Sequence, residues 1–293
     1  MLLVTSPILY LAFNRIESVK RTFPEIRKAQ PAQLFVGCDG PRDNEEQKKT
    51  DEVRKYILEH IDWDCDVKTL FRDDNLGCKY AVSGAIDWFF HHVEEGIILE
   101  DDCLPDQSFF RFCDEMLEKY RDEDMVMNVA GENMLAEFKA DDSYIFSKYF
   151  YCWGWATWRD SWEKMDLEMD NYVDKDKHLY SGIIERTLWE KRFNDNIARV
   201  INSWATSFFF SQMYHKKLCV VPKCNLVENI GFLESATHTK ENKYDSKYLH
   251  HLRNEIEFPL IHPNKIIQNK KFDREFVRQD LKRVILKNLS YFK

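Results

Sequence analysis

The run Gly96-Ile97-Ile98-Leu99-Glu100-Asp101-Asp102 places three carboxylates directly after a short apolar segment. Such a segment is typical of a buried strand in an α/β sheet, and the carboxyl end of that strand is where these sheets bind ligands. Carboxylates crowded at this edge repel each other unless a hard divalent cation, which also bridges to phosphate oxygens, neutralises them. The run therefore predicts a metal and nucleotide site that includes Asp102.

Two other aspartate pairs, Asp73-Asp74 and Asp141-Asp142, lack this setting. Neither follows a clean apolar strand, so we interpret both as solvated acidic turns. Asp101-Asp102 alone follows such a strand and precedes Pro105 and a helical pattern over 109–120. The structural context of the pair, rather than its acidity, makes it a candidate site.

The apolar pattern predicts strands and helices that alternate along the first half of the chain. The predicted strands are 7–13, 33–38, 67–71, 96–99 and 125–129, and the predicted helices are 17–27, 44–60, 77–92 and 109–120. This order, with short connections, predicts an α/β fold with a mostly parallel sheet covered on both faces by helices. After residue 130 the alternation weakens and aromatic residues become dense.

Polar residues follow each of the first strands: Asn14 and Arg15, then Asp39, then the segment 72–77. In a parallel sheet these strand ends converge on one crevice that a nucleotide can fill. The chain contains neither G-x-G-x-x-G nor G-x-x-x-x-G-K-[ST]. Phosphates are therefore expected to be held by a metal ion rather than by a glycine-rich loop.

Length and composition limit the class of protein. With 293 residues and 44% hydrophobic content, the chain can form one large domain, or one domain with an appendage. It has no apolar run long enough to span a membrane and no secretory signal pattern, which predicts a cytoplasmic location. The net charge of −8 argues against a general nucleic-acid-binding protein. The eight cysteines form no C-x-x-C pair, so we expect them to be reduced and structural.

The segment 265–293 differs in charge from the rest of the chain, with nine Lys or Arg residues against three acidic residues. Apolar residues recur in it at helical spacing from Phe272 to Phe292. The pattern predicts a basic amphipathic helical tail over 263–293. Such a helix can lie on an anionic membrane surface, cap the fold or pair subunits.

The ordered series of motifs resembles the GT-A-fold glycosyltransferases, and within them N-acetylglucosaminyltransferase I and its bacterial relatives. The series covers about residues 7 to 240. It consists of Asn14-Arg15, Cys38-Asp39, Asn75-Leu76-Gly77, Leu99-Glu100-Asp101-Asp102 with Phe109-Phe110, Trp153-Gly154-Trp155, Asn229-Ile230-Gly231 and Thr237-His238. The resemblance implies a Rossmann-like GT-A domain over 1–262, with a nucleotide-binding half (1–130) and an aromatic-rich acceptor half (131–262).

The resemblance also implies roles for single residues. Arg15 and Asp39 would contact the uridine of a UDP-sugar donor, Asp101 the ribose, Glu100 the donor sugar and Asp102 a Mn²⁺ or Mg²⁺ ion. Further donor contacts are implied for Asn75, Gly77, Trp155 and His238. Simpler interpretations remain open for several of these, since Arg15 can be a cation at a helix start and Asp39 a turn residue before Gly40-Pro41.

The segment 149–158 has six aromatic residues in ten around Gly154. Its rings can shape a sugar and acceptor pocket, or they can simply pack in the core. Glu132 and Asn133 follow the predicted strand 125–129 and are expected beside this segment. His238 can contact the donor diphosphate or the metal, or it can stabilise its own loop.

An inverting transferase needs a general base for the acceptor hydroxyl. In the eukaryotic relative a Trp-Asp-Asp-Trp segment supplies it, whereas the counterpart here, Ile201-Asn202-Ser203-Trp204, has no carboxylate. Glu234 is the first candidate, because it lies in the segment that closes over the donor in the family. The other candidates are Asp195, Glu228 and Glu132.

Together these features predict a metal-dependent, inverting glycosyltransferase that moves a sugar from a UDP-sugar to a hydroxyl of a surface glycan or a lipid-linked saccharide. The alternatives are a non-catalytic protein that binds nucleotide sugars or glycans, and a sugar-nucleotide pyrophosphorylase. A pyrophosphorylase would need a glycine-rich loop with Arg and Lys near the N-terminus, which the segment 8–15 lacks. The predicted partners are the nucleotide sugar, the glycan acceptor and a membrane surface beneath the tail.

Overall fold

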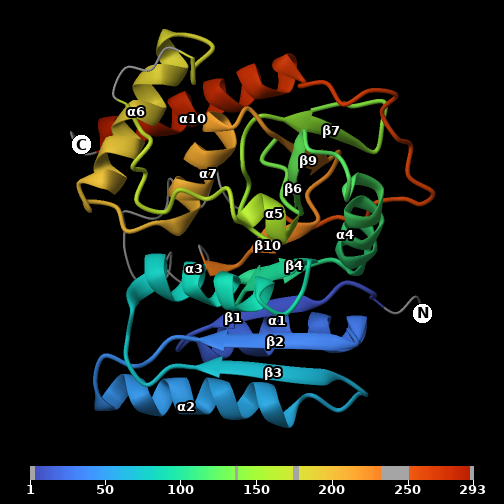
Figure 1. Cartoon of the computed structure of the whole chain (residues 1–293), viewed down its shortest axis with the longest axis vertical. Coiled ribbons are helices and arrows are strands. Elements are labelled where there is room, and N and C mark those ends of the chain that lie inside the picture. Colours follow the sequence, from blue (N-terminus) through green and yellow to red (C-terminus); the bar gives the residue numbers. More distant parts are fainter. Residues whose placement is uncertain (1–3, 136–137, 174–177, 232–250, 291–293) are drawn as a thin grey trace.

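The computed structural model describes residues 4–135, 138–173, 178–231 and 251–290. Within these ranges the chain forms an eight-stranded sheet with helices on both faces (Figure 1). A separate two-stranded antiparallel ribbon joins β5 and β10. The α/β fold with a mostly parallel sheet, predicted from the apolar pattern, is confirmed.

The first half of the chain alternates strands and helices as predicted. Its elements are β1 (Ile8–Ala12), α1 (Ile16–Ala29), β2 (Gln33–Cys38), α2 (Asn44–Glu59), β3 (Asp66–Phe71), α3 (Gly77–Phe90), β4 (Glu95–Glu100), β5 (Cys103–Pro105), α4 (Gln107–Tyr120) and β6 (Val126–Ala130). Aspartates start two of these helices, because the Asp43 carboxylate accepts from the Glu46 backbone N–H at 2.8 Å and Asp106 accepts from Ser108 at 2.9 Å.

The second half is less regular. Its elements are β7 (Tyr144–Ser147), β8 (Trp155–Trp158), α5 (Arg159–Trp162), α6 (Ile183–Ile197), α7 (Trp204–Tyr214), β9 (Leu218–Pro222), β10 (Val227–Asn229) and α10 (Lys270–Ser290). Among the described residues, no helix is both long enough and apolar enough to cross a membrane.

The strand order in the sheet is β3-β2-β1-β4-β8-β6-β9-β7. Strands β3, β2, β1, β4, β6 and β9 run in one direction, whereas β8 and β7 run in the other. The chain moves outward from β1 through β2 to β3 and then returns to place β4 on the other side of β1. This reversal between β1 and β4 is the switch point at which open α/β sheets bind ligands.

Alternate residues of the strands enter two hydrophobic cores, one on each face of the sheet. In β1, Ile8 and Tyr10 face the core under α1, α2 and α4, while Leu9 and Leu11 face the core under α3, α6, α7 and α10. Gly96 in β4 lets α3 approach closely, because a Cβ there would lie 2.3 Å from Cζ of Phe89. Both faces of the sheet are therefore covered, as a parallel sheet requires.

The aromatic residues of the second half form much of the second core. Trp155 on β8 is 1% exposed and packs against Trp204 of α7, with ring centroids 5.6 Å apart and planes at 22°. Phe150 and Phe208 close the same cluster edge-on, with centroids 4.8 Å apart. Packing accounts for the position of Trp155, which leaves Trp153 as the more accessible indole of the motif.

The C-terminal helix α10 begins in the fold rather than beside it. Phe272 is fully buried and Phe276 is 8% exposed, both in the second core. Asp273, also buried, accepts hydrogen bonds from Ser147 Oγ of β7 and from Gln268 Nε2, each at 2.6 Å. The first turns of the predicted amphipathic tail are therefore anchored to the sheet.

We expect Phe272→Ala to lower the free energy of unfolding by about 3 to 5 kcal/mol, because it opens a cavity in a closed core. Lys282→Ala, at an exposed position of the same helix, should change it by less than about 0.5 kcal/mol. Urea unfolding followed by circular dichroism measures both values. Equal stability of the two variants would contradict the packing of α10 into the core.

Candidate functional site

The polar strand ends of the first half meet at the switch point between β1 and β4. A cavity of about 400 Å³ opens there, lined by residues that follow β1, β2 and β4 and by the first turns of α3. Arg15, Asp39, Asn75, Glu100 and Asp101 all line it. We call it the switch-point cavity. These five predicted donor residues are thus brought together at one edge of the sheet, whereas Gly77 and Trp155 do not line the cavity.

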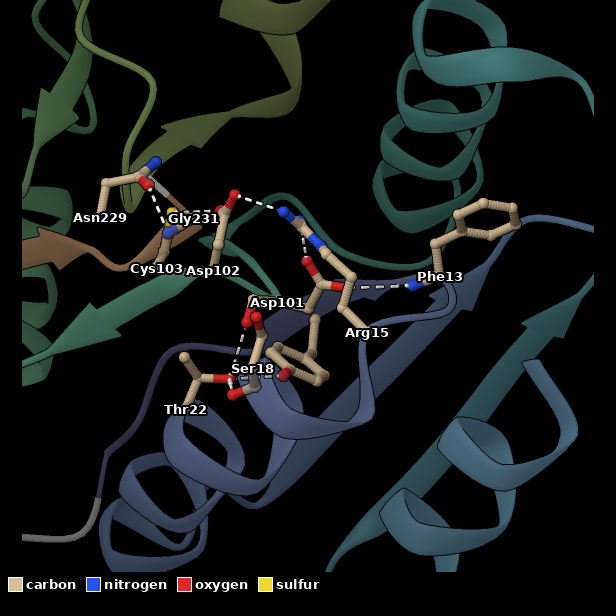
Figure 2. Close-up of polar contacts among 10 residues, drawn as sticks. Phe13, Arg15, Ser18, Thr22, Asp101, Asp102, Cys103, Asn229 and Gly231 are labelled. Atoms are coloured by element: carbon tan, nitrogen blue, oxygen red, sulfur yellow. Dashed lines mark hydrogen bonds and ion pairs between the residues drawn. The ribbon is translucent and has the colours of Figure 1, made fainter. Parts of the chain in front are cut away.

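Arg15 is the cation that faces the acidic run (Figure 2). From the turn between β1 and α1, its Nη1 donates to Asp102 Oδ2 at 3.0 Å and its Nη2 donates to Asp101 Oδ1. Asp101 is held further by the backbone N–H of Phe13, at 3.2 Å from its Oδ2. The guanidinium of Arg15 thus forms ion pairs with two of the three carboxylates.

The largely buried run Glu100-Asp101-Asp102 carries more negative charge than the single guanidinium of Arg15 can balance. Burial raises the pKa of Asp101 to about 6, against the opposing effect of Arg15. Burial, followed by the charges of Asp102 and Asp101, raises the pKa of Glu100 well above its usual range. Both shifts come first from burial of the carboxylates, and a bound cation would favour their charged forms.

Asp102 has the surroundings that a metal ligand needs. Its side chain is 16% exposed, compared with 3% for Asp101. The end of β10 packs against it, since the Ile230 N–H donates to the Asp102 carbonyl oxygen at 2.9 Å. A Cβ on Gly231 would lie 2.5 Å from Asp102 Oδ2, so only glycine keeps the space beside that oxygen (Figure 2). The residues present therefore fit a divalent cation at Asp102.

The structure does not gather several metal-binding side chains at one point. Among the described residues, no group of three or more His, Cys, Asp or Glu side chains could hold a metal ion. A divalent ion that bridges phosphates needs only one or two carboxylates, so this arrangement suits a metal that is completed by substrate and water. Glu234 and His238 lie outside the described residues, in the segment that follows Gly231.

Asp39 has a structural partner at the start of α3. Its carboxylate accepts from the backbone N–H groups of Leu76 and Gly77, each at 3.0 Å. Asn75 Nδ2 donates to the carbonyl oxygen of Gly40 at 2.7 Å, which ties the same two loops. Gly77 starts the helix at φ +75°, a conformation that glycine adopts without strain. Asp39 therefore caps α3 as well as lining the cavity.

The remaining candidates fall at different places. Glu132, 3% exposed after β6, lines a second cavity of about 400 Å³ together with Trp153. Asp195 lies on α6, pairs with Lys191 Nζ at 2.6 Å and lines neither cavity. Glu228 lies in β10 with 8% exposure.

Several cavity residues were not indicated by the sequence pattern. Arg42 lines the switch-point cavity, and Trp189 and Arg192 of α6 line the second one. Trp189 and Arg192 are three residues apart, so helical spacing places them on one face. Nothing in the local sequence shows what that face contacts, because its neighbours come from other parts of the chain.

The fold and this edge define a mostly parallel α/β sheet, covered by helices on both faces, with an acidic site at its switch point. No family model matches the chain, and no curated protein matches it. Many solved structures are similar to it. Among them are HddC from Yersinia pseudotuberculosis (11% identity, 57% of this chain and 80% of that one, TM-score 0.34), the mannosyltransferase PcManGT from Pyrobaculum calidifontis in complex with GDP-Man and Mn²⁺ (11%, 71% and 74%, 0.37), and a UDP-glucose pyrophosphorylase complexed with UDP-glucose (9%, 78% and 95%, 0.42).

These values describe a distant likeness, from which no activity follows for this chain. The closer relation to N-acetylglucosaminyltransferase I stays a prediction from the sequence motifs.

Asp39→Ala should lower the free energy of unfolding by about 1 kcal/mol in the absence of any nucleotide, because two helix N–H groups lose their acceptor. Asp74→Ala, an exposed acid in the loop that precedes α3, serves as the matched control and should leave stability unchanged. Thermal unfolding without ligand compares the two. If Asp39→Ala is as stable as the wild type, the capping role is wrong.

Proposed function

We propose that the chain is a metal-dependent, inverting glycosyltransferase. It would transfer a sugar from a UDP-sugar to a hydroxyl of a surface glycan or a lipid-linked saccharide. One observation carries this proposal: three carboxylates are crowded at a cavity at the switch point of the sheet, and a single guanidinium, that of Arg15, pairs with two of them. Residues 1–130 would hold the donor, and residues 131–262 would hold the acceptor.

The donor nucleotide would occupy the switch-point cavity, whose volume of about 400 Å³ lies in the range of small-molecule sites. Arg15 and Asp39 would approach the uridine, Asp101 the ribose, and Glu100 the transferred sugar. Asn75 and Gly77 would position the loop that borders the base. Asp39 would do so while it caps α3, because a carboxylate oxygen accepts more than one hydrogen bond.

A Mn²⁺ or Mg²⁺ ion would be held by Asp102 and would stabilise the charge of the departing diphosphate. Arg15 now donates to the Oδ2 of Asp102 that faces Gly231. Arg15 would keep its bond to Asp101 when a cation takes that oxygen, since the guanidinium already contacts both carboxylates. The ion pair would thus hold the acidic run together when the metal is absent.

We expect Asp102→Asn to weaken Mn²⁺-dependent binding of UDP by about 100-fold or more, because it removes the charged ligand of the metal. The fold should persist, since the substitution relieves repulsion among buried acids. Asp141→Asn, in an exposed acidic pair, is the control and should bind UDP as the wild type does. Isothermal titration with UDP and MnCl₂ measures both affinities, and unchanged affinity in Asp102→Asn would exclude this metal site.

Release of UDP from nucleotide sugars distinguishes an enzyme from a binding protein. A transferase hydrolyses its donor slowly when water replaces the acceptor, whereas a non-catalytic binder releases no UDP. The assay uses the wild-type protein with MnCl₂ and a panel of UDP-sugars. Binding without any release would favour the non-catalytic alternative.

We further propose that the region around α10 contacts an anionic membrane surface. A groove of about 440 Å³ lies between α10 and the start of α6. Ile183 and Ile184, which line it, are 83% and 55% exposed. Lys270, Arg274 and Arg278 of α10 line the same groove. Exposed apolar side chains beside a cationic helix face fit the interface of an anionic bilayer.

The full-length protein should sediment with vesicles that contain phosphatidylglycerol at low salt, and less so as ionic strength rises. Replacing Lys270, Arg274 and Arg278 by serine should weaken this binding by about 100-fold, at about 1 kcal/mol for each charge. Ile183→Ser tests the exposed apolar surface of the groove. Val200→Ser, at a position that is 75% exposed and lies outside the groove, is its control. Failure of the wild type to bind, or self-association through the same residues, would contradict the membrane contact.

A further inference from the structure

The second cavity lies on the helical side of the acceptor half. It has a volume of about 400 Å³ and is lined by Glu132 after β6, by Trp153 before β8, by Trp189 and Arg192 of α6 and by Phe276 of α10. Its walls thus combine aromatic rings with charged groups. This composition is suited to a saccharide, which presents both apolar ring faces and hydroxyl groups.

Two residues that line this cavity each have a buried polar side-chain atom with no hydrogen-bond partner among the described residues. The atoms are Oε1 of Glu132 and Nε1 of Trp189. Glu132 is 3% exposed and Trp189 is also 3% exposed. Buried polar groups in native proteins are nearly always paired, so such atoms indicate a ligand or an ordered solvent molecule. One atom is a hydrogen-bond acceptor and the other a donor, which is the pairing that a sugar hydroxyl can satisfy.

Sheet topology places Glu132 near the acidic run. Strands β4 and β6 point the same way with antiparallel β8 between them, so the end of β4, the start of β8 and the end of β6 lie at one edge. The Gly131 N–H donates to the Gly154 carbonyl oxygen at 2.7 Å across this edge. Glu100 and Glu132 therefore lie about two strand spacings apart, roughly 10 Å.

The charges of both acids act on one thiol, that of Cys152. After burial, the largest influences on the pKa of the Cys152 thiol are the charges of Glu132 and Glu100, which both raise it. Cys152 and Trp153 line the second cavity, while Glu100 lines the switch-point cavity.

We propose that the second cavity binds the acceptor saccharide and that Glu132 is the catalytic base. This inference rests on the proposed transferase function. The acceptor O–H would transfer its proton to Glu132 Oε1, and the oxygen would use the freed electron pair to form a bond to C1 of the donor sugar. The bond from C1 to the diphosphate oxygen would break, and UDP would leave with that electron pair. Trp189 Nε1 would donate to a second oxygen of the acceptor.

The surroundings of Glu132 set its protonation. Burial raises the pKa of Glu132 to about 8, and a backbone hydrogen bond from Trp153 acts against the shift. Below pH 8 the carboxyl is therefore mainly protonated and cannot accept a proton. Turnover is expected to rise with pH and to level off above pH 8.

Other groups near Glu132 bear on this profile, and burial raises the pKa of Glu100, in the switch-point cavity, to about 8 as well. Burial raises the pKa well above its usual value for three other groups, Tyr151, Cys152 and Cys219. The negative charge of Glu132 raises the pKa of each of them further. The other charged side chains of the cavity are Arg192 of α6 and an ion pair of α10. In that pair, Nη2 of Arg283 lies 2.7 Å from Oδ1 of Asp280.

The same pKa predicts an effect on stability. A carboxyl whose pKa is higher in the folded state than in the unfolded chain favours folding when protonated, so its ionisation costs stability as pH rises from about 4 to 8. Glu132→Gln removes this cost. The variant should therefore unfold at a temperature at least as high as that of the wild type at pH 8, which separates loss of activity from loss of fold.

The experiment measures UDP release from UDP-glucose and from UDP-N-acetylglucosamine by the full-length protein with MnCl₂, between pH 6 and 9. Water takes the place of the acceptor hydroxyl. Glu132→Gln should lower turnover by about 100-fold or more, with UDP affinity unchanged by calorimetry. Glu190→Gln, whose side chain pairs with Arg186 at 2.7 Å and lines neither cavity, should keep wild-type turnover.

The outcomes separate the two proposals. Turnover by the wild type together with equal turnover by Glu132→Gln would overturn the role of Glu132 and leave the transferase function standing. No turnover of either nucleotide sugar by the wild type would overturn both. A wild-type profile that is flat between pH 6 and 9 would also overturn the role of Glu132. Because the pKa of Glu100 is raised into the same range, persistence of the full pH-dependent rise in Glu132→Gln would overturn it too.

Discussion

The ion pair between Arg15 and the two aspartates after β4 is the interaction on which the candidate site depends. It joins the turn after β1 to the end of β4 across the switch point, so it closes the one place where the strand order reverses. Without this guanidinium, Asp101 and Asp102 would lose the cation that pairs with both of them. The pair therefore explains how an acidic ligand edge remains folded before a cation arrives.

The second half of the chain serves a different purpose. Its aromatic residues fill the core on one face of the sheet, and Trp155, Trp204 and Phe208 pack there as a closed cluster. This packing fixes the start of β8 at the same edge as the acidic run. Glu132 is held in place by the same packing and is buried at a cost, since its ionised form is disfavoured. Burial of the proposed base, Glu132, thus lowers the stability of the folded protein.

Much of the first half was predictable from the sequence, because each of its elements carries a local signal. The predicted strand 33–38 coincides with β2, and the predicted helix 44–60 matches α2 to within one residue. The acidic run follows β4 as expected. Helical spacing also predicted α10, yet it did not show that Phe272 and Phe276 enter the core, because burial depends on which surface a helix meets.

The sequence by itself determined the alternation of elements and the chemistry at each strand end, because periodicity and residue type are local properties. It also determined that Arg15, Asp39 and the run 100–102 would share one edge, since parallel strands all end on the same side. Only the tertiary structure decided that Asp39 caps α3 and that Glu132 lines a cavity with Trp189. These contacts join residues from separate elements, and their partners are set by how the helices pack on the sheet rather than by the order of residues.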